Sequence, residues 1–197
     1  MDRNDYSVND IYCYPNSTTL KNLFNITDAD HLDKIEQTVV ATRLTELNDI
    51  FLPYPISFLY LKEIHKYLFQ SIYIWAGKIR TVRLSKPNLA FAYPEYILQE
   101  TNKLFKKLKT KNYYKQTTKS DFCCYLADFK TEINIIHPFR DGNGRSIRKL
   151  LEDIAFKAGF RVHFEKISYA QYLQAMIESS NDNTLLKNLL MDIITFL

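Results

Sequence analysis

Glycine, cysteine and long apolar runs are all scarce in this chain of 197 residues. Only 4 glycines accompany 14 tyrosines and 13 phenylalanines, so we expect a compact core rich in aromatic side chains. The 3 cysteines, of which Cys123 and Cys124 are adjacent, lack a framework spacing, and this is typical of reduced thiols in the cytoplasm. No apolar run approaches the roughly 20 residues of a membrane span. The first five residues lack the apolar stretch of a signal peptide.

These absences predict a soluble cytoplasmic protein without membrane contact, with secretion as an effector as the open alternative. The charge is nearly balanced, with 26 basic and 22 acidic residues and a formal net charge of +4. That excess suits an anionic ligand but falls short of the basic footprint of a nucleic-acid binder, so no nucleic-acid partner is expected. The length predicts one domain, residues 1–197, that buries its core unaided.

Hydrophobic periodicity predicts a mainly helical chain. Apolar side chains recur at helical spacing in segments that begin near Thr27, Ser57, Pro94, Ser120, Ser168 and Asn183. Pro138 should end one helix near His137, and Gly159 should stop the helix that follows. The last helix is expected to run to Leu197.

One stretch, residues 77–93, departs from this helical pattern. Residues 80–85 and 89–93 are rich in strand formers, and the turn residues Lys86, Pro87 and Asn88 separate them. The expected fold is therefore all-α with a small inserted β-hairpin.

The most informative segment is residues 137–148, His-Pro-Phe-Arg-Asp-Gly-Asn-Gly-Arg-Ser-Ile-Arg. Gly142, Asn143 and Gly144 can all adopt left-handed backbone conformations. Their amides then open a helix, and successive N–H groups at a helix N-terminus form an anion-binding concavity. Arg145 and Arg148 are three residues apart and project to one face. A bound polyanion would relieve their conflict with the helix dipole.

Two further groups complete this segment. Asp141 stands directly before the turn, and a lone carboxylate beside a polyphosphate is a typical Mg²⁺ ligand. His137 lies at the end of the preceding helix, close enough to act as a general base.

Each feature also has a structural interpretation. A lone histidine before proline is more often structural than catalytic, and a Gly-Asn-Gly sequence is usually only a turn. Arg148 could pair with Glu152, and Lys149 with Asp153. His65 has no partner at metal-ligand spacing and is expected to be structural. The coincidence of the motif features within twelve residues nevertheless favours function.

The segment resembles the Fic-family motif, His-x-Phe-x-[Asp/Glu]-Gly-Asn-Gly-[Lys/Arg]-x-x-Arg, at every fixed position. Residues 14–22 are similar to the family's N-terminal signature, and residues 74–82 and 91–94 to its flap. The resemblance covers most of the chain, and it implies transfer of AMP from Mg·ATP to a tyrosine, threonine or serine hydroxyl of a target protein.

The resemblance also implies a role for each motif residue. The expected roles are base for His137, core anchor for Phe139, Mg²⁺ ligand for Asp141, anion hole for Gly142, Asn143 and Gly144, β/γ-phosphate contact for Arg145, γ-phosphate contact for Arg148, and target docking through the flap residues Lys86 and Pro87. Lys86 could equally be a solvated turn residue.

Other activities stay open beside AMP transfer. Doc-like relatives transfer the γ-phosphate, but their motif lacks the second glycine and the final arginine, and both Gly144 and Arg148 are present here. Removal of AMP and use of other nucleotides are further alternatives. A non-catalytic nucleotide- or protein-binding module would be favoured by a missing base, whereas His137 is present.

Many Fic proteins are restrained by a helix with [Ser/Thr]-x-x-x-Glu-[Gly/Asn], whose glutamate pairs with the final arginine of the motif. Thr42 and Glu46 fit its first five positions, but Leu47 stands where glycine or asparagine belongs. No residues follow the last predicted helix. We therefore expect a separate, antitoxin-like inhibitor, as in a toxin–antitoxin pair, with inhibition from within by Glu46 as the alternative.

Overall fold

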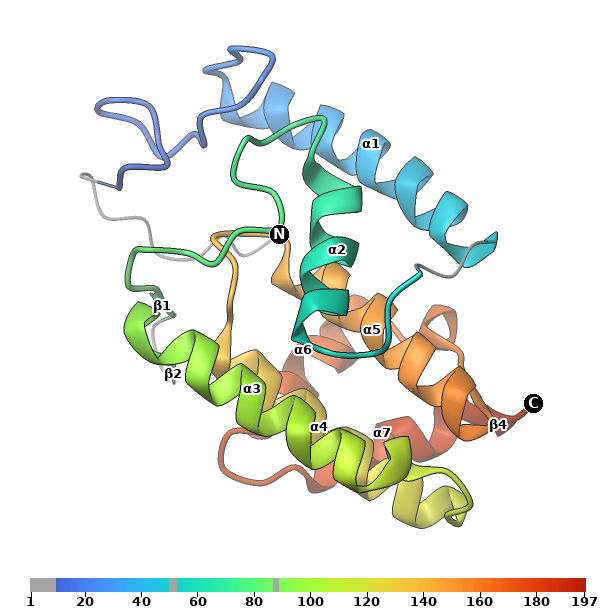
Figure 1. Ribbon diagram of the computed structural model, residues 1–197. Coiled ribbons are helices and arrows are strands. Elements are labelled where there is room, and N and C mark those ends of the chain that lie inside the picture. Colours follow the sequence, from blue (N-terminus) through green and yellow to red (C-terminus); the bar gives the residue numbers. More distant parts are fainter. Residues whose placement is uncertain (1–9, 50–52, 87–88) are drawn as a thin grey trace.

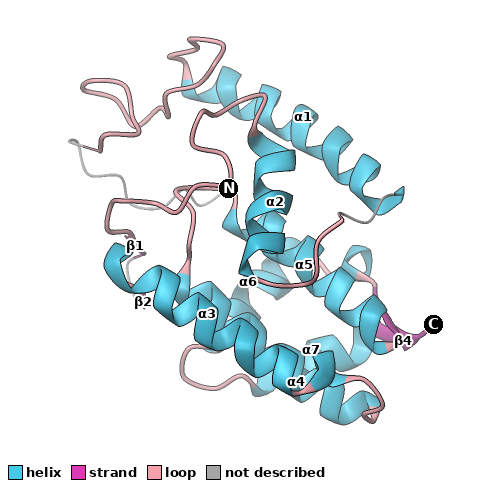
Figure 2. Ribbon diagram, viewed as in Figure 1, coloured by secondary structure: helices cyan, strands magenta, loops and turns pink. Residues whose placement is uncertain are grey.

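The computed structural model describes residues 10–49, 53–86 and 89–197, and within them the chain is mainly helical (Figures 1 and 2). The helices are α1 (Ala29–Asp49), α2 (Phe58–Phe69), α3 (Pro94–Thr110), α4 (Lys119–Ile136), α5 (Asn143–Ala158), α6 (Tyr169–Glu178) and α7 (Thr184–Ile193), with short 3₁₀ turns η1 (Asn112–Tyr114) and η2 (Phe164–Lys166). The strands are β1 (Ser85–Lys86), β2 (Leu89–Ala90), β3 (Phe160–Val162) and β4 (Ile194–Phe196). The expected fold class, helical with a small hairpin, is confirmed.

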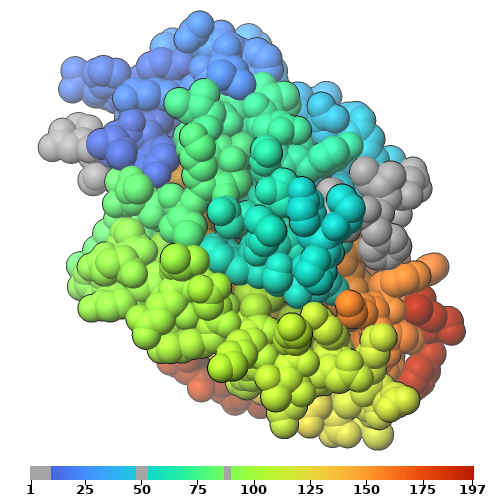
Figure 3. All heavy atoms as spheres, viewed as in Figure 1, coloured from blue at the N-terminus to red at the C-terminus, as the bar shows by residue number. Residues whose placement is uncertain are grey.

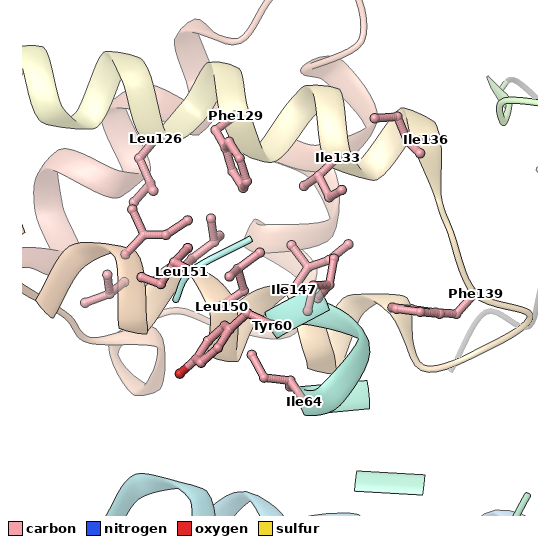
Figure 4. Packing of buried hydrophobic residues seen from close by; sticks show 14 of the residues in the cluster. Tyr60, Ile64, Leu126, Phe129, Ile133, Ile136, Phe139, Ile147, Leu150 and Leu151 are labelled. Atoms are coloured by element: carbon pink, nitrogen blue, oxygen red, sulfur yellow. The ribbon is translucent and has the colours of Figure 1, made fainter. Parts of the chain in front are cut away.

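Helix α5 lies at the centre of the core. It packs against α2 on one side and α4 on the other, and Figure 4 shows the apolar side chains of all three helices meeting there. The residues that fill this contact are Ile64 of α2, Leu126, Phe129 and Ile133 of α4, and Ile147, Leu150 and Leu151 of α5, all of them buried. Because α5 is surrounded by these helices, the loop that precedes it is held at a defined place.

Most of the predicted start and stop signals are where the helices begin and end. The Ser57 hydroxyl accepts from the Tyr60 N–H and caps α2, and Pro94 occupies the first turn of α3. Ser168 and Gln171 form the reciprocal capping box of α6. Gly159 ends α5 with φ +96°, in the left-handed region that glycine favours.

Two predicted caps are displaced. Thr118, not Ser120, caps α4, because its hydroxyl accepts from the Asp121 N–H. Asp28, not Thr27, accepts from the His31 N–H at the start of α1. In both places two or more capping residues are neighbours in the sequence, and composition alone does not choose between them.

The prediction that the last helix runs to Leu197 is wrong. Helix α7 ends at Ile193, and residues 194–196 pair antiparallel with residues 160–162. β-Branched residues at this point favour extended backbone, and Phe196 packs on Phe160 with ring centroids 5.1 Å apart. This second sheet joins the chain end to the end of α5.

The predicted hairpin is present but shorter than expected. Its paired residues are Ser85 with Ala90 and Lys86 with Leu89, so residues 80–84 are not a strand. Pro87, the second predicted docking residue, lies outside the described residues.

The N-terminal half of the chain, coloured blue to yellow-green, makes up most of the face seen in Figure 3. Over the described ranges no helix combines the length and the apolar character that a membrane crossing needs. Cys13, Cys123 and Cys124 are free thiols.

Candidate active site

The loop between α4 and α5 makes two left-handed turns. His137 ends α4 with φ +48°, and Gly142 precedes α5 with φ +74°. The expectation of left-handed backbone at all three turn residues is wrong for Asn143 and Gly144, which already lie in the first turn of α5. The Asn143 amide instead closes the loop: it accepts from the Phe139 N–H at 2.9 Å and donates to the Phe139 carbonyl at 2.8 Å.

Gly142 is required by close approach as well as by backbone conformation. A Cβ atom at this position would lie 2.4 Å from the ring of Phe69. As the residue before α5 it has no side chain to cap the helix. The N–H groups of the first turn are therefore available to an anion, as the anion-hole interpretation requires.

His137 is buried, with 8% of its surface exposed. A hydrogen bond of one ring nitrogen fixes which nitrogen carries the proton. Its Nδ1 lies 3.2 Å from the Asn134 carbonyl oxygen. A carbonyl only accepts, so Nδ1 carries the proton and Nε2 keeps its lone pair. Phe91 of the flap stacks on the imidazole with centroids 3.8 Å apart and fixes the plane of the ring.

Burial lowers the pKa of His137 to about 3; the Asn134 carbonyl opposes this shift, and Arg80, Lys86 and Lys130 add to it. The imidazole is therefore neutral at physiological pH and can accept a proton. A polyphosphate bound nearby would raise this pKa, because negative charge stabilises the imidazolium. His137 is thus a stronger base when the site is filled than when it is empty.

Arg80 holds the base of the flap against the end of α4. Only 1% of the residue is exposed, and its guanidinium donates to carbonyl groups alone. The acceptors are the carbonyls of His137 at 2.7 Å, Val82 at 2.6 Å, Ala92 at 2.5 Å and Ile136 at 3.3 Å. Burial lowers its pKa to about 10, which still leaves it charged at neutral pH. Two of these carbonyls end α4 and lack helical partners, so Arg80 stabilises the conformation in which His137 faces the site.

Replacing Arg80 should therefore loosen both the flap and the catalytic loop. Arg80→Met should lower the free energy of unfolding by at least about 2 kcal/mol, because several buried carbonyls lose their donor. Arg83→Met is the matched control, since Arg83 is exposed and contacts the ring of Tyr93. Chemical denaturation measures both variants. Equal stabilities of the two variants would contradict the assignment.

Asp141, Arg145 and Glu36 form a buried ionic group beside the loop. Arg145 Nη2 lies 2.6 Å from Glu36 Oε1 and 3.8 Å from Asp141 Oδ1. Tyr73 donates to the second oxygen of Glu36. Burial raises the pKa of Glu36, and Arg145 opposes the rise. Arg145 therefore already has a carboxylate partner on α1, which the sequence did not reveal.

Arg148 has a different environment. It is half-buried, and its Cζ lies 5.9 Å from the ring centre of Tyr172. A groove of about 370 Å³ runs past Arg145 and Arg148, and its other wall is an apolar stretch of α1. The structure thus brings both motif arginines to one groove, as their spacing predicts. The expected pair of Lys149 with Asp153 is present at 2.7 Å.

His65 of α2 connects the loop to the root of the flap, a role that spacing did not show. Its Nδ1 accepts from the Gly77 N–H at 2.8 Å, so its Nε2 carries the proton and donates to the Asp141 carbonyl at 2.9 Å. The ring stacks on Phe139 with centroids 3.9 Å apart. Burial lowers the pKa of His65 to about 3, so the imidazole stays neutral. His65 is therefore structural, as expected. The part of the molecule that it stabilises is the candidate active site.

The hydrogen bonds of the two ring nitrogens of His65 can be tested separately by substituting asparagine or glutamine. His65→Asn keeps an acceptor near Gly77 and loses the donor to Asp141, whereas His65→Gln keeps the donor and loses the acceptor. His65→Asn should slow the AMP transfer that the motif predicts by about 10- to 100-fold, since small displacements of a reacting group cost that much. His65→Gln should retain more activity at a similar melting temperature. Equal loss in both variants would argue against the tether at Asp141.

Asp10 is another residue whose role appears only in three dimensions. Arg140, the variable position after Phe139, is fully buried, and its Nη2 lies 2.6 Å from Asp10 Oδ2. Tyr12 continues the contact, because its hydroxyl accepts from the Thr81 N–H at the flap base. The segment before α1 thus packs on both the loop and the flap. The sequence offered no signal for this contact, because the burial of Arg140 is visible only in the structure and its partner lies 130 residues away.

Comparison with known proteins finds related sequences and structures. The family model described as Fic/DOC family matches residues 55–155. A protein of Sinorhizobium fredii, named "Probable protein adenylyltransferase y4lH", is 37% identical over 175 residues, which is 88% of this chain and 89% of that protein. The protein adenylyltransferase VbhT of Bartonella schoenbuchensis is 30% identical over 89% of this chain and 37% of its own length. The crystal structure of BepC from Bartonella tribocorum, a VirB-translocated effector with bound AMPPNP, superposes with a TM-score of 0.87 at 28% identity, over 94% of this chain and 97% of that one.

Proposed function

This chain belongs to the Fic/DOC family and is a nucleotidyltransferase of the protein adenylyltransferase type, and we propose that it transfers AMP from ATP to a hydroxyl side chain of a target protein with His137 as the base. The observation that carries the proposal is the orientation of His137. Its Nδ1–H is held by the Asn134 carbonyl, which leaves the Nε2 lone pair for the proton of the hydroxyl. The same proposal takes residues 1–197 as one Fic domain.

In the proposed reaction the target oxygen attacks the α-phosphorus of ATP, and the bond from that phosphorus to the bridging oxygen breaks. Pyrophosphate leaves, and the hydroxyl proton passes to Nε2 of His137. Negative charge grows on the phosphate oxygens, and the N–H groups of the first turn of α5 are positioned to stabilise it. Arg148 reaches the groove beside this turn and would contact the γ-phosphate. Arg145, already paired with Glu36, would contribute to the β- and γ-phosphates from the same side.

Asp141 fits the role of Mg²⁺ ligand. Its carboxylate is 22% exposed at the edge of the loop, and Oδ1 accepts from the Gly142 N–H at 2.5 Å. The described residues hold no group of three or more acidic, histidine or cysteine side chains that would form a complete metal site. A single carboxylate suits Mg²⁺, which takes its other ligands from water and phosphate. When bound, the ion would neutralise charge on the α- and β-phosphates.

AMP transfer is preferred to phosphate transfer because Gly144 and Arg148 are both present at the site. Gly144 is exposed in the first turn of α5, and a Cβ there would meet nothing within 4 Å. Its backbone is therefore open to a phosphate group. The mass added to a modified target, that of an AMP unit or that of a phosphate, distinguishes the two reactions.

Substitution of the base tests the proposed mechanism. His137→Ala should abolish labelling of the target by α-labelled ATP, while affinity for ADP changes little, because the phosphates bind to α5 and not to the imidazole. His31→Ala, an exposed histidine on α1, is the control and should label at the wild-type rate. A labelling rate for His137→Ala near that of the control would show that another group takes the proton.

The flap is the proposed docking site for the target. Lys86 of the hairpin is within electrostatic reach of His137, whose pKa it lowers. An extended target segment would add to the edge of the hairpin as a further strand. We also propose a cytoplasmic location. Secretion is the alternative, and the BepC relative is an effector of that kind.

A separate inhibitor is the proposed regulator, as for the toxin of a toxin–antitoxin pair. The groove beside the motif arginines is lined on its α1 side by the polar Gln37 and the apolar Val40, Ala41 and Leu44, and it would accept an amphipathic helix. A glutamate on such a helix would compete with the γ-phosphate for Arg148. Glu46 is less suited to this task, since it is 44% exposed and pairs locally with Arg43 at 2.9 Å and with the Tyr67 hydroxyl at 2.8 Å.

Glu46→Gly decides between the two inhibitors. Measured without partners, its self-labelling should equal that of the unmodified chain, because Glu46 is engaged by its neighbours. Glu46→Gln is the control for the helix, since glycine destabilises a helix interior by about 1 kcal/mol. A large rise in self-labelling in both variants would show that Glu46 inhibits from within and would remove the need for a partner.

A further inference from the structure

Lys130 is a buried cation near enough to the motif to lower the pKa of His137. It lies on α4 seven residues before His137, hence two turns away on the same side of the helix. Only 2% of its surface is exposed. Burial of an ammonium group is costly unless an anion accompanies it. The surroundings of Lys130 therefore call for an explanation.

The charged groups that act on Lys130 are cations. Arg148 of α5 and Lys86 of the flap both lower its pKa, in addition to burial, which is the largest cause; the result is about 7. His137, at the end of the same helix, is neutral. Within the described part of the chain no carboxylate is found to pair with Lys130. Three other buried cations have carboxylate partners, since Arg140 pairs with Asp10, Arg145 with Glu36 and Lys149 with Asp153. Arg80 has none, but backbone carbonyls accept its hydrogen bonds.

Among the described residues, the contact that compensates the charge of Lys130 is with an aromatic ring. Its Nζ lies 5.8 Å from the ring centre of Tyr172 on α6, and the Cζ atom of Arg148 lies 5.9 Å from the same ring. A cation near an aromatic face gains much less than it gains from a carboxylate. Tyr172 thus lies near both cations. Arg148 also has Glu152 nearby, whose pKa it lowers, whereas the charge of Lys130 stays largely uncompensated.

We propose that Lys130 binds an anionic phosphate group of the nucleotide, together with Arg148, and that Tyr172 holds both side chains in place. The inference rests on the proposed function only in taking a nucleotide as the ligand. The bound phosphate is the counterion that the protein itself does not supply. In the protein without a bound nucleotide, an apolar side chain of similar length would be more stable at this buried position. Lysine here therefore serves nucleotide binding at the expense of the free energy of unfolding.

Two consequences distinguish this role from a structural one. At pH 8 a lysine with a pKa near 7 is mostly neutral, and a bound phosphate restores its charge. Binding should therefore take up about 0.9 proton on account of Lys130. The variant Lys130→Met keeps the length, removes the titrating group, and should melt at the same temperature as the wild type or higher. Lys130→Arg keeps the charge and stays protonated, so it should bind without this uptake.

The experiment is calorimetric titration of the full chain with AMPPNP, an ATP analogue that carries a third phosphate, at pH 8 in two buffers of different ionisation enthalpy. The wild type should bind with proton uptake. Lys130→Met should bind about 10- to 100-fold more weakly, since a hydrogen bond to a charged group is lost, and its uptake should fall by nearly one proton. Lys109→Met is the matched control, because it removes an exposed lysine from α3 and should change neither quantity.

The outcomes separate the two proposals. Wild-type affinity for AMPPNP in Lys130→Met, or uptake that persists in it, overturns the role of Lys130. A weakened Lys130→Met together with a wild type that binds AMPPNP but labels no protein with ATP leaves the role intact and refutes AMP transfer. A wild type that binds no AMPPNP overturns both.

Discussion

The conformation of the loop between α4 and α5 depends on one buried guanidinium. Arg80 donates to four carbonyls that belong to the flap base, the approach to α3 and the last residues of α4. The last carbonyl groups of a helix have no partners within the helix. Carbonyls that are buried here cannot bond to water instead, so they need a donor from the protein. Arg80 fills that need from the side of the flap. The histidine and the hairpin that faces it are consequently parts of one rigid unit.

A second tether acts from the opposite side. His65 joins the Asp141 carbonyl to the Gly77 amide, and its ring packs against Phe139, which the loop directs into the core. Figure 4 shows Phe139 on the loop that leads from α4 to α5. The first turn of α5 is thereby presented to the groove at a fixed angle. Groups that are held in place before the substrate arrives need no reorganisation during the reaction.

Charge is distributed unevenly between the core and the site. Arg140 and Arg145 lie beneath the loop and have carboxylates from the segment before α1 or from α1 itself. Arg148 and Lys86 both act on the buried Lys130 as like charges. A paired buried cation stabilises the fold, whereas an unpaired one costs free energy until an anion binds. The site is therefore less stable than its surroundings when empty, and a nucleotide should stabilise the whole domain by binding.

The sequence by itself determined the local features. Helix caps at Ser57 and Ser168, the stop at Gly159 and the left-handed turn at Gly142 follow from single residues and their neighbours, and the same holds for the motif, whose residues lie within twelve positions.

Tertiary structure alone decided what needs partners distant in the chain. Asp10, Glu36 and His65 were invisible as functional residues, because a carboxylate or imidazole has the same sequence pattern whether it faces solvent or the loop. Residues 80–84 have strand-forming side chains but no partner strand. Within this segment the Val82 carbonyl accepts from the Arg80 guanidinium. Residues 194–196 form β4 and do not continue α7, because β3 lies beside them and offers an edge for pairing. Hydrogen-bond partners and burial are properties of the packed molecule, and they override local propensity wherever the two conflict.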